Sequence, residues 1–247
     1  MSIYRLIFRL DFEPNFQMFD STGKIMGKLL SETIEGNKFL PELLERSQGH
    51  GVAAKYVNET STEMRMLTIE PVSIHGSFEL SKGVSLEKLE QNVVFEKIIK
   101  LVNEFRREFG IEVLTRCGIR FFYLSKFNSD DENIISKFNI LFNNNLVDTV
   151  ENKLGSISDV GIIFEGQNKD LTKYRVHFGP YSKKESDRYF PTISNYLKTV
   201  DGFNFIADID LYEANFTLHS SVSFMKWCNP LIKKAHDYVS DIKSIII

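Results

Sequence analysis

The sequence predicts an α+β fold in which mostly antiparallel strands pack against long amphipathic helices. Three observations predict this class. Apolar residues occupy every second position in segments 3–12 and 112–124, as in strands with one buried face. They recur at three- and four-residue steps in segments 85–109 and 220–247, as in helices with one buried face. Strands and helices do not alternate one by one along the chain, which disfavours a parallel βαβ arrangement.

The N-terminal third is predicted to contain strands around two short helices. Segment 3–12 is the first strand, with Arg5 and Arg9 on the face opposite its alternating apolar residues. Short helices are predicted at 25–34 and 38–46, separated by a Gly-Asn pair. A meander of three strands should follow, at 51–57, 63–70 and 72–80. These three segments are short and alternating or β-branched, and polar turn formers and a proline separate them.

A long helix followed by a strand forms the predicted centre of the chain. Segment 85–109 carries one apolar stripe along about seven turns, and Gly110 provides the stop. Segment 112–124 then changes to a period of two, which places Arg116 and Arg120 together on one face of a strand.

The C-terminal part is predicted to repeat this mixture of strands and helices. Its predicted elements are a helix at 132–154, a hairpin of 157–164 with 174–178, a strand at 203–212 and a helix at 220–247 interrupted at Pro230. We therefore expect two similar α+β halves, residues 1–127 and 128–247, or one continuous domain that contains both.

Composition describes a folded protein without a strong charge. The chain has 247 residues, 43% of them hydrophobic, and 21 Phe, which is enough apolar material for a sizeable core. Its 30 Lys and Arg nearly balance its 33 Asp and Glu, and the signs are mixed along the chain. This balance disfavours general binding to nucleic acid or to a membrane surface.

Sequence features also favour a cytoplasmic location. The only two cysteines, Cys117 and Cys228, lie in strand and helix patterns, which disfavours a disulfide framework and a cysteine zinc site. Segment 1–10 contains two arginines within its apolar pattern, unlike a signal peptide. No apolar run approaches the roughly 18 residues of a membrane-spanning helix.

The arginines of the two long strands are the first candidate site. Arg5 and Arg9 are four residues apart, as are Arg116 and Arg120, so each pair shares a strand face. If the two strands are neighbours, the four side chains form a patch whose geometry suits phosphate or carboxylate. The structural alternative, which is the default, is a set of cross-strand ion pairs with Asp side chains on a solvated face.

Two carboxylates are the second candidate. Asp208 and Asp210 share a face of the predicted strand 203–212, and such a pair can hold Mg²⁺ through its oxygens. The alternative function is therefore a metal-assisted phosphoryl or nucleotidyl enzyme that uses this pair with Arg116 and Arg120. The sequence contains no glycine-rich phosphate loop to support it.

The third candidate is a basic segment whose cations are interleaved with aromatic residues, a composition that suits a phosphate backbone. It contains Arg175, His177, Lys183, Lys184 and Arg188. Two acidic residues dilute it, so a solvated loop is the simpler interpretation and nucleic acid is a disfavoured partner.

Two segments resemble a sporadically distributed, functionally uncharacterised prokaryotic family of roughly this length. They are RCGIRFFYL, residues 116–124, and FIADIDLYE, residues 205–213. The family has an Arg-x-Gly-apolar-Arg-aromatic strand and an Asp-apolar-Asp strand in the same order. The resemblance implies no catalytic residues.

The sequence thus favours a non-enzymatic binding or assembly protein of the prokaryotic cytoplasm. Its five histidines show no metal-binding spacing, and no nucleophile motif is present. We expect it to act through a protein partner, a second copy of itself or a small anionic ligand, without a cofactor. Mg²⁺ belongs only to the alternative enzyme.

Overall fold

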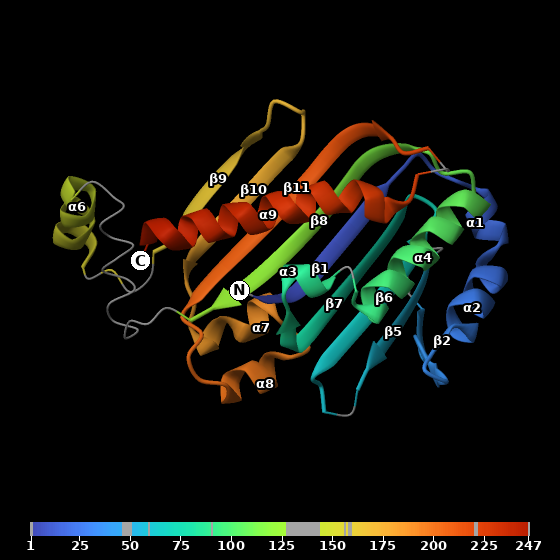
Figure 1. Ribbon diagram of the computed structural model, residues 1–247, viewed down its shortest axis with the longest axis horizontal. Coiled ribbons are helices and arrows are strands. Elements are labelled where there is room, and N and C mark those ends of the chain that lie inside the picture. The colour runs from blue at the N-terminus through green and yellow to red at the C-terminus, as the bar shows by residue number, and fades with distance from the viewer. Residues whose placement is uncertain are drawn as a thin grey trace.

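Nine antiparallel strands form one sheet that runs through the whole molecule (Figure 1). The computed structural model describes residues 2–45, 51–58, 60–89, 91–126, 144–155, 157, 160–219 and 222–246. The strands of the sheet are β1 (Ser2–Asp11), β4 (Glu42–Glu45), β5 (Val52–Val57), β6 (Glu63–Glu70), β7 (Ser73–Val84), β8 (Val113–Ser125), β9 (Ile162–Gln167), β10 (Lys173–Pro180) and β11 (Phe205–Thr217). Their order in space is β4-β5-β6-β7-β1-β8-β11-β10-β9. The predicted α+β class is therefore confirmed.

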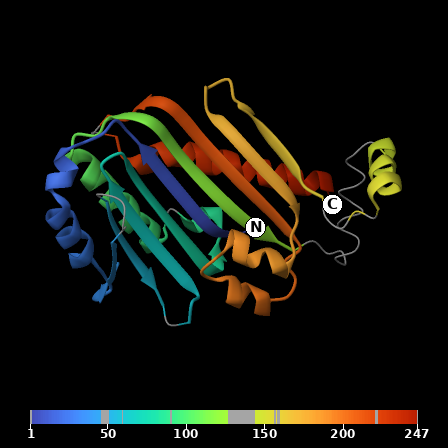
Figure 2. The same cartoon turned by 180° about the vertical axis from the view of Figure 1, so that it is seen from behind.

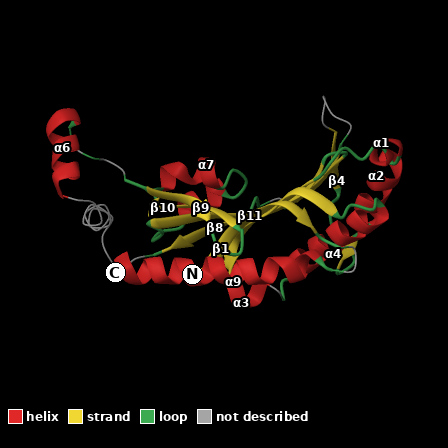
Figure 3. Ribbon diagram, turned by 90° about the horizontal axis from the view of Figure 1, so that it is seen from above, coloured by secondary structure: helices red, strands yellow, loops and turns green. Residues whose placement is uncertain are grey.

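The helices divide between the two faces of this sheet. Three of them lie on one face: α3 (Leu86–Leu89), α4 (Val93–Glu108) and α9 (Phe224–Ile246). Two short helices cover one end of the opposite face, α7 (Ser186–Tyr189) and α8 (Ser194–Thr199), as Figures 2 and 3 show. The remaining elements are α1 (Gln17–Asp20), α2 (Thr22–Ser31), the small hairpin of β2 (Thr33–Ile34) with β3 (Asn37–Lys38), α6 (Asn144–Leu154) and the 3-10 turn η1 (Lys183–Glu185).

The connections on the two sides of the central strand pair have a similar outline but differ in detail, with four strands in the set beside β1 and three in the set beside β8. β1 is followed by the meander β4–β7, whose last strand returns to pair with β1, and α4 comes next. β8 is likewise followed by the meander β9–β11, whose last strand returns to pair with β8, and α9 comes next. β1 and β8 pair antiparallel at the centre, so the sheet is continuous across the chain.

The main core lies between the sheet and the helices α4 and α9. Phe78 of β7 packs on Phe95 of α4, and Phe8 of β1 packs on Phe224 of α9, each with ring centroids 5.6 Å apart. A Cβ at Gly76, opposite Phe8 in the sheet, would lie 2.6 Å from the Phe8 ring, so glycine makes room for it. Burying each such ring contributes about 1.5–3 kcal/mol.

The predicted central helix is divided in the structure. Segment 85–109 was expected to be one helix, but α3 ends at Leu89 and α4 begins at Val93. Asn92 has an extended backbone, and its side chain accepts hydrogen bonds from the backbone N–H groups of Val94 and Phe95. Asparagine at this position caps a new helix, a role that the apolar stripe does not reveal. The stop at Gly110, with φ of +63°, is as predicted.

Other element boundaries differ from prediction. The prediction of a helix at 38–46 is wrong, because Glu42–Glu45 forms β4 and pairs with β5. The hairpin of β9 and β10 is present, with β9 beginning at Ile162. Of the helix expected at 132–154, residues 132–143 lie outside the described part of the chain. Among the helices that the structure describes, none combines the length and apolar character needed to cross a membrane.

Candidate anion-binding site

Strand pairing assembles a row of charged and aromatic side chains on the sheet face opposite α4 and α9. Arg5 of β1 lies opposite Glu79 of β7 and opposite Phe122 of β8. Phe122 in turn lies opposite Asp208 of β11, which lies opposite His177 of β10. Residues that are opposite each other in a sheet point to the same face, so all five side chains share one face.

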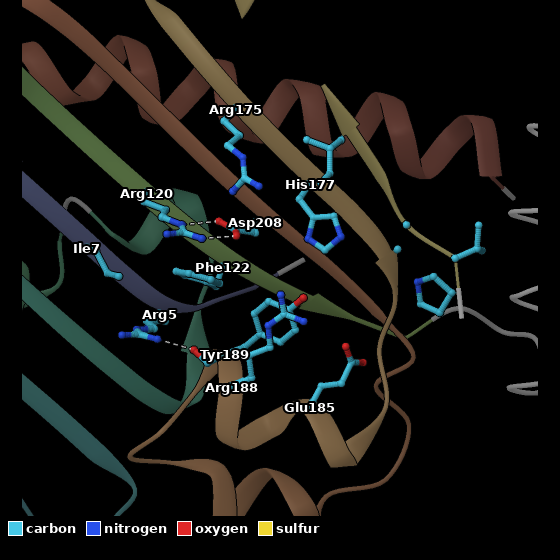
Figure 4. Close-up of a pocket in the computed structure, with 15 residues that line it drawn as sticks. Arg5, Ile7, Arg120, Phe122, Arg175, His177, Glu185, Arg188, Tyr189 and Asp208 are labelled. Carbon is cyan, nitrogen blue, oxygen red and sulfur yellow. Dashed lines mark hydrogen bonds and ion pairs between the residues drawn. The ribbon is translucent and has the colours of Figure 1, made fainter. Parts of the chain in front are cut away.

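A cavity of about 340 Å³ opens above this row (Figure 4). It also covers the neighbouring row of the same face, to which Arg120 and Arg175 belong. Arg120 of β8 and Arg175 of β10 enter it from the sheet, and Arg188 of α7 and Glu185 of η1 line its opposite side. Four different elements, β1, β8, β10 and α7, thus supply one arginine each.

Arg120 and Asp208 form the fixed centre of the cavity. The Nε and Nη2 atoms of Arg120 donate to the two carboxylate oxygens of Asp208 at 2.6 and 2.5 Å. This two-point contact fits the planar guanidinium and raises its pKa further. The ring of Phe122 lies 4.8 Å from the Cζ atom of Arg120 and 5.3 Å from that of Arg5, so it separates the two guanidinium groups.

Arg5 and Glu79 attach the short helices to the sheet. Arg5 Nη1 donates to the backbone oxygen of Tyr189 at 2.7 Å, and Arg5 Nε lies 3.4 Å from a Glu79 oxygen. The other Glu79 oxygen accepts from the backbone N–H groups of Thr192 and Ile193 at 2.9 and 3.2 Å. Burial raises the pKa of Glu79 and lowers that of Arg5. Arg5 therefore has mainly a structural role.

Arg175 and Arg188 are the accessible cations of the cavity. Arg175 Nε donates to Glu165 at 2.7 Å, but both side chains are about half exposed or more, so this pair is weak. The Arg188 guanidinium lies 5.3 Å from the ring of Tyr189 and pairs with no carboxylate in the described part of the chain. Both can therefore bind a ligand at little cost.

His177 lines the cavity between these arginines. Burial lowers its pKa, although the nearby Asp208 opposes the shift, so the ring is neutral near pH 7. Neither ring nitrogen makes a hydrogen bond to a described residue. A Cβ at Gly161 would lie 2.8 Å from His177 Nε2, so glycine leaves space for the ring.

The four strand arginines do not form one patch. Arg9 is exposed, lies outside the cavity and donates to Asp11 at 2.6 Å. Arg116 also lies outside the cavity and donates to Asp210 at 3.0 Å, with its Cζ atom 4.4 Å from the ring of Tyr212. Arg116 thus forms the cross-strand ion pair of the structural alternative, whereas Arg9 pairs with a carboxylate of its own strand. Of these four arginines, Arg5 and Arg120 line the cavity.

The basic segment is divided in the same way. Arg175, His177 and Arg188 line the cavity, and Lys183 and Lys184 do not. Strand pairing thus brings the strand-arginine candidate and the basic-segment candidate together, because β10 pairs with β11 and β11 pairs with β8.

Asp208 and Asp210 share a strand face, and an arginine contacts each of them. Both arginines would compete with a metal ion for these carboxylates. Burial raises the pKa of Asp210 despite the neighbouring Arg116. Within the described ranges there is no group of three or more His, Cys, Asp or Glu side chains able to hold a metal.

Sequence reasoning missed Glu79, Phe122 and Tyr189. Glu79 had a weak signal, because it is a carboxylate between Phe78 and Leu80 in a predicted strand. In the structure its side chain is fully buried. Tyr189 had none, because α7 is a single turn in a segment with a loop composition.

Comparisons of the chain with protein-family models, curated proteins and solved structures found no match. The fold and cavity define an antiparallel α+β protein with an arginine-lined cavity, and its function is inferred from that geometry.

His177 predicts a pH dependence of stability. Its pKa is lower in the folded chain than the ordinary value of 6.5, so the unfolded chain takes up a proton first as the pH falls. The contribution of His177 is complete above pH 6.5 and is lost as the pH falls from there toward the folded pKa. Denaturant unfolding at about pH 7.5 and about pH 5.5 should show a smaller loss in His177→Gln than in wild type. The exposed His219 provides the control, and a His177→Gln profile equal to that of His219→Gln would refute the assignment.

Proposed function

We propose that this chain is a non-enzymatic binding protein of the cytoplasm whose ligand is a small molecule with a phosphate or carboxylate group. The observation that carries the proposal is the convergence of arginines from four elements on one cavity, one of which, Arg188, has no carboxylate partner among the described residues. Arginine is the side chain best suited to planar, two-point recognition of such anions.

The nearly balanced charge of the cavity supports a small anionic ligand over a highly charged polyanion. Four arginines and two carboxylates, Asp208 and Glu185, line the cavity. Glu79 and Glu165 neutralise Arg5 and Arg175 from just outside the lining, and Asp208 neutralises Arg120. Glu185 balances the charge of Arg188 in the sum, but no ion pair joins the two described side chains, and a Glu185 oxygen accepts from the Ser182 N–H. The Arg188 guanidinium is therefore the one that a ligand can contact without displacing a carboxylate. The neutral His177 adds a second group that can become positive when an anion binds.

Unused donors support a mode in which such an anion would be held. Arg120 contacts Asp208 through Nε and Nη2, which leaves Nη1 for a ligand. Arg175 contacts Glu165 through Nε, which leaves both terminal nitrogens. An anion bound by these groups and by Arg188 would leave the central Arg120–Asp208 pair intact.

The proposal predicts that Arg188→Gln weakens anion binding by at least about tenfold, because a charge-assisted hydrogen bond contributes about 1.5–3 kcal/mol. Isothermal titration with inorganic phosphate and with citrate measures the affinity. Arg9→Gln is the matched control, since Arg9 lies on the same sheet face outside the cavity and should bind like wild type. The proposal would be refuted if the wild-type protein bound neither probe, or if both variants lost the same amount of affinity.

We also propose that the chain consists of two similar halves of common origin. The similar connectivity of its two parts supports this proposal. Each part begins with a long strand, returns to it through a meander and continues into a helix on the same sheet face. Arg5 and Arg9 in β1 have the same spacing as Arg116 and Arg120 in β8.

A further inference from the structure

A second cavity, of about 460 Å³, lies on the other face of the sheet, beside α9. Strand alternation produces it. Val176, Ile209 and Leu211 point to this face, whereas His177 and Asp208, their neighbours in sequence, point to the arginine-lined face. The lining of this second cavity is Phe164, Asn168, Tyr174, Val176, Ile209, Leu211, Lys234, Ala235 and Tyr238.

Most of this lining is apolar or aromatic. Val176, Ile209 and Leu211 form the part of the wall that belongs to β10 and β11, and Ala235 contributes a small side chain from α9. Phe164 on the edge strand β9 is 50% exposed, although it is a large aromatic residue. An apolar surface of this size with a few polar groups is typical of small-molecule sites.

Two tyrosines supply polar groups inside the cavity. No hydrogen bond joins the hydroxyl of Tyr174 or Tyr238 to any described residue. Burial raises the pKa of Tyr238, with a further contribution from Tyr174, so the Tyr238 phenol keeps its proton. A tyrosine hydroxyl can donate a hydrogen bond, so both rings offer a donor. A Cβ at Gly166 would lie 2.6 Å from the Tyr174 hydroxyl, so the glycine allows the ring to lie across β9.

A lysine and an amide complete the polar side of the cavity. Lys234 forms an ion pair with Asp170, and the two side chains are 43% and 54% exposed. Such an exposed pair contributes at most about 1 kcal/mol, so a ligand carboxylate can compete for the ammonium group. Asn168 lines the same cavity.

We propose that this cavity binds a small molecule with an apolar body and a carboxylate head group, such as a medium-chain fatty acid. The apolar wall takes the body, and Lys234 with the two tyrosine hydroxyls binds the head group. All three of these groups donate hydrogen bonds, which favours an anionic head over a cationic one. The proposal is independent of the anion-binding function, because the two cavities open on opposite faces of the sheet.

Three probes with the same ten-carbon chain test the head group: decanoate, decan-1-ol and decyltrimethylammonium. Titration calorimetry is done below the micelle concentrations of the two ionic probes and below the solubility limit of decan-1-ol. It should show one equivalent of decanoate bound, with weaker binding of the alcohol and weakest binding of the ammonium compound. Lys234→Gln should weaken decanoate binding by about fivefold and leave the alcohol unchanged, as expected for one exposed charge pair. Lys233→Gln, an exposed neighbour outside the cavity lining, is the matched control.

The apolar wall is tested by Ala235→Phe, which should fill the cavity and abolish binding of decanoate and decanol alike. If that variant does not fold, the comparison of the two lysine variants still decides, because both positions are exposed. Equal affinity for decanoate and decyltrimethylammonium, equal effects of the two lysine variants, or uptake of many equivalents would each overturn the proposal. So would tight binding of an amphipathic helical peptide with no binding of decanoate.

Discussion

Methionine in place of Arg106 is expected to lower the free energy of unfolding by about 4 kcal/mol. Arg106 is a fully buried arginine of α4, and its guanidinium contacts backbone carbonyls instead of a carboxylate. It donates to the carbonyl oxygens of Ile111 at 3.1 Å, Val222 at 2.8 Å and His219 at 3.3 Å, and also to that of Leu218.

The size of this effect follows from the partners that remain. A buried ion pair can often be replaced by apolar residues because both charges leave together, but backbone carbonyls cannot be removed. Each carbonyl left buried without a donor costs about 1–3 kcal/mol. Arg106→Lys should recover only part of the loss, since one ammonium cannot reproduce the planar fork that contacts carbonyls of residue 111 and of segment 218–222.

Denaturant unfolding of Arg106→Met and Arg107→Met measures this prediction. Arg107 is the next residue on the same helix and is exposed, so its substitution should change the free energy by no more than about 0.5 kcal/mol. Equal stabilities of the two variants would show that the carbonyl contacts of Arg106 do not stabilise the fold.

Arg106 also shows why part of the structure could not be predicted from the sequence. On an amphipathic helix, an arginine beside a buried phenylalanine has the pattern of a residue at the edge of the polar face. Three of its four carbonyl partners lie more than 100 residues away, and a backbone carbonyl has no residue-specific signature. The split of the predicted helix at Asn92 has a similar cause, because one capping side chain interrupts an otherwise continuous apolar stripe.

Strands and their faces could be predicted because alternation is a local property. The period of two in segments 3–12 and 112–124 correctly places Arg5 and Arg9 on one side of β1, and Arg116 and Arg120 on one side of β8. Which of them face the cavity depends on strand order and register, which are set by contacts between distant segments. A helix was wrongly predicted at 38–46 because short apolar runs fit both periods.

The cavity itself could be predicted only in pieces for the same reason. Its cations were recognised as two unrelated candidates, one on strands and one in a basic segment. Pairing of β8, β11 and β10 joins them, and the contact between Arg5 and Tyr189 brings α7 over the sheet. These contacts span up to 184 residues of sequence.

Alanine in place of Glu79 is expected to lower the free energy of unfolding by about 3 kcal/mol, and glutamine by less than about 1 kcal/mol. The raised pKa of Glu79 shows that burial outweighs the attraction of Arg5, so its main contribution is the oxygen that accepts from the N–H groups of Thr192 and Ile193. Glutamine keeps that acceptor. Alanine removes it from the two N–H groups and also removes the second oxygen, which lies beside Arg5.

Linkage gives the Glu79 prediction a second measurement. For an acid whose pKa is raised on folding, the protonated form stabilises the native state. This contribution is complete below the ordinary value of 4.5 and is lost as the pH rises through the folded pKa. The stability of wild type relative to Glu79→Gln, measured by denaturant unfolding, should therefore fall as the pH rises across this window. A glutamine variant as unstable as the alanine variant, with a difference that grows as the pH rises, would instead make the charge pair with Arg5 the dominant contact.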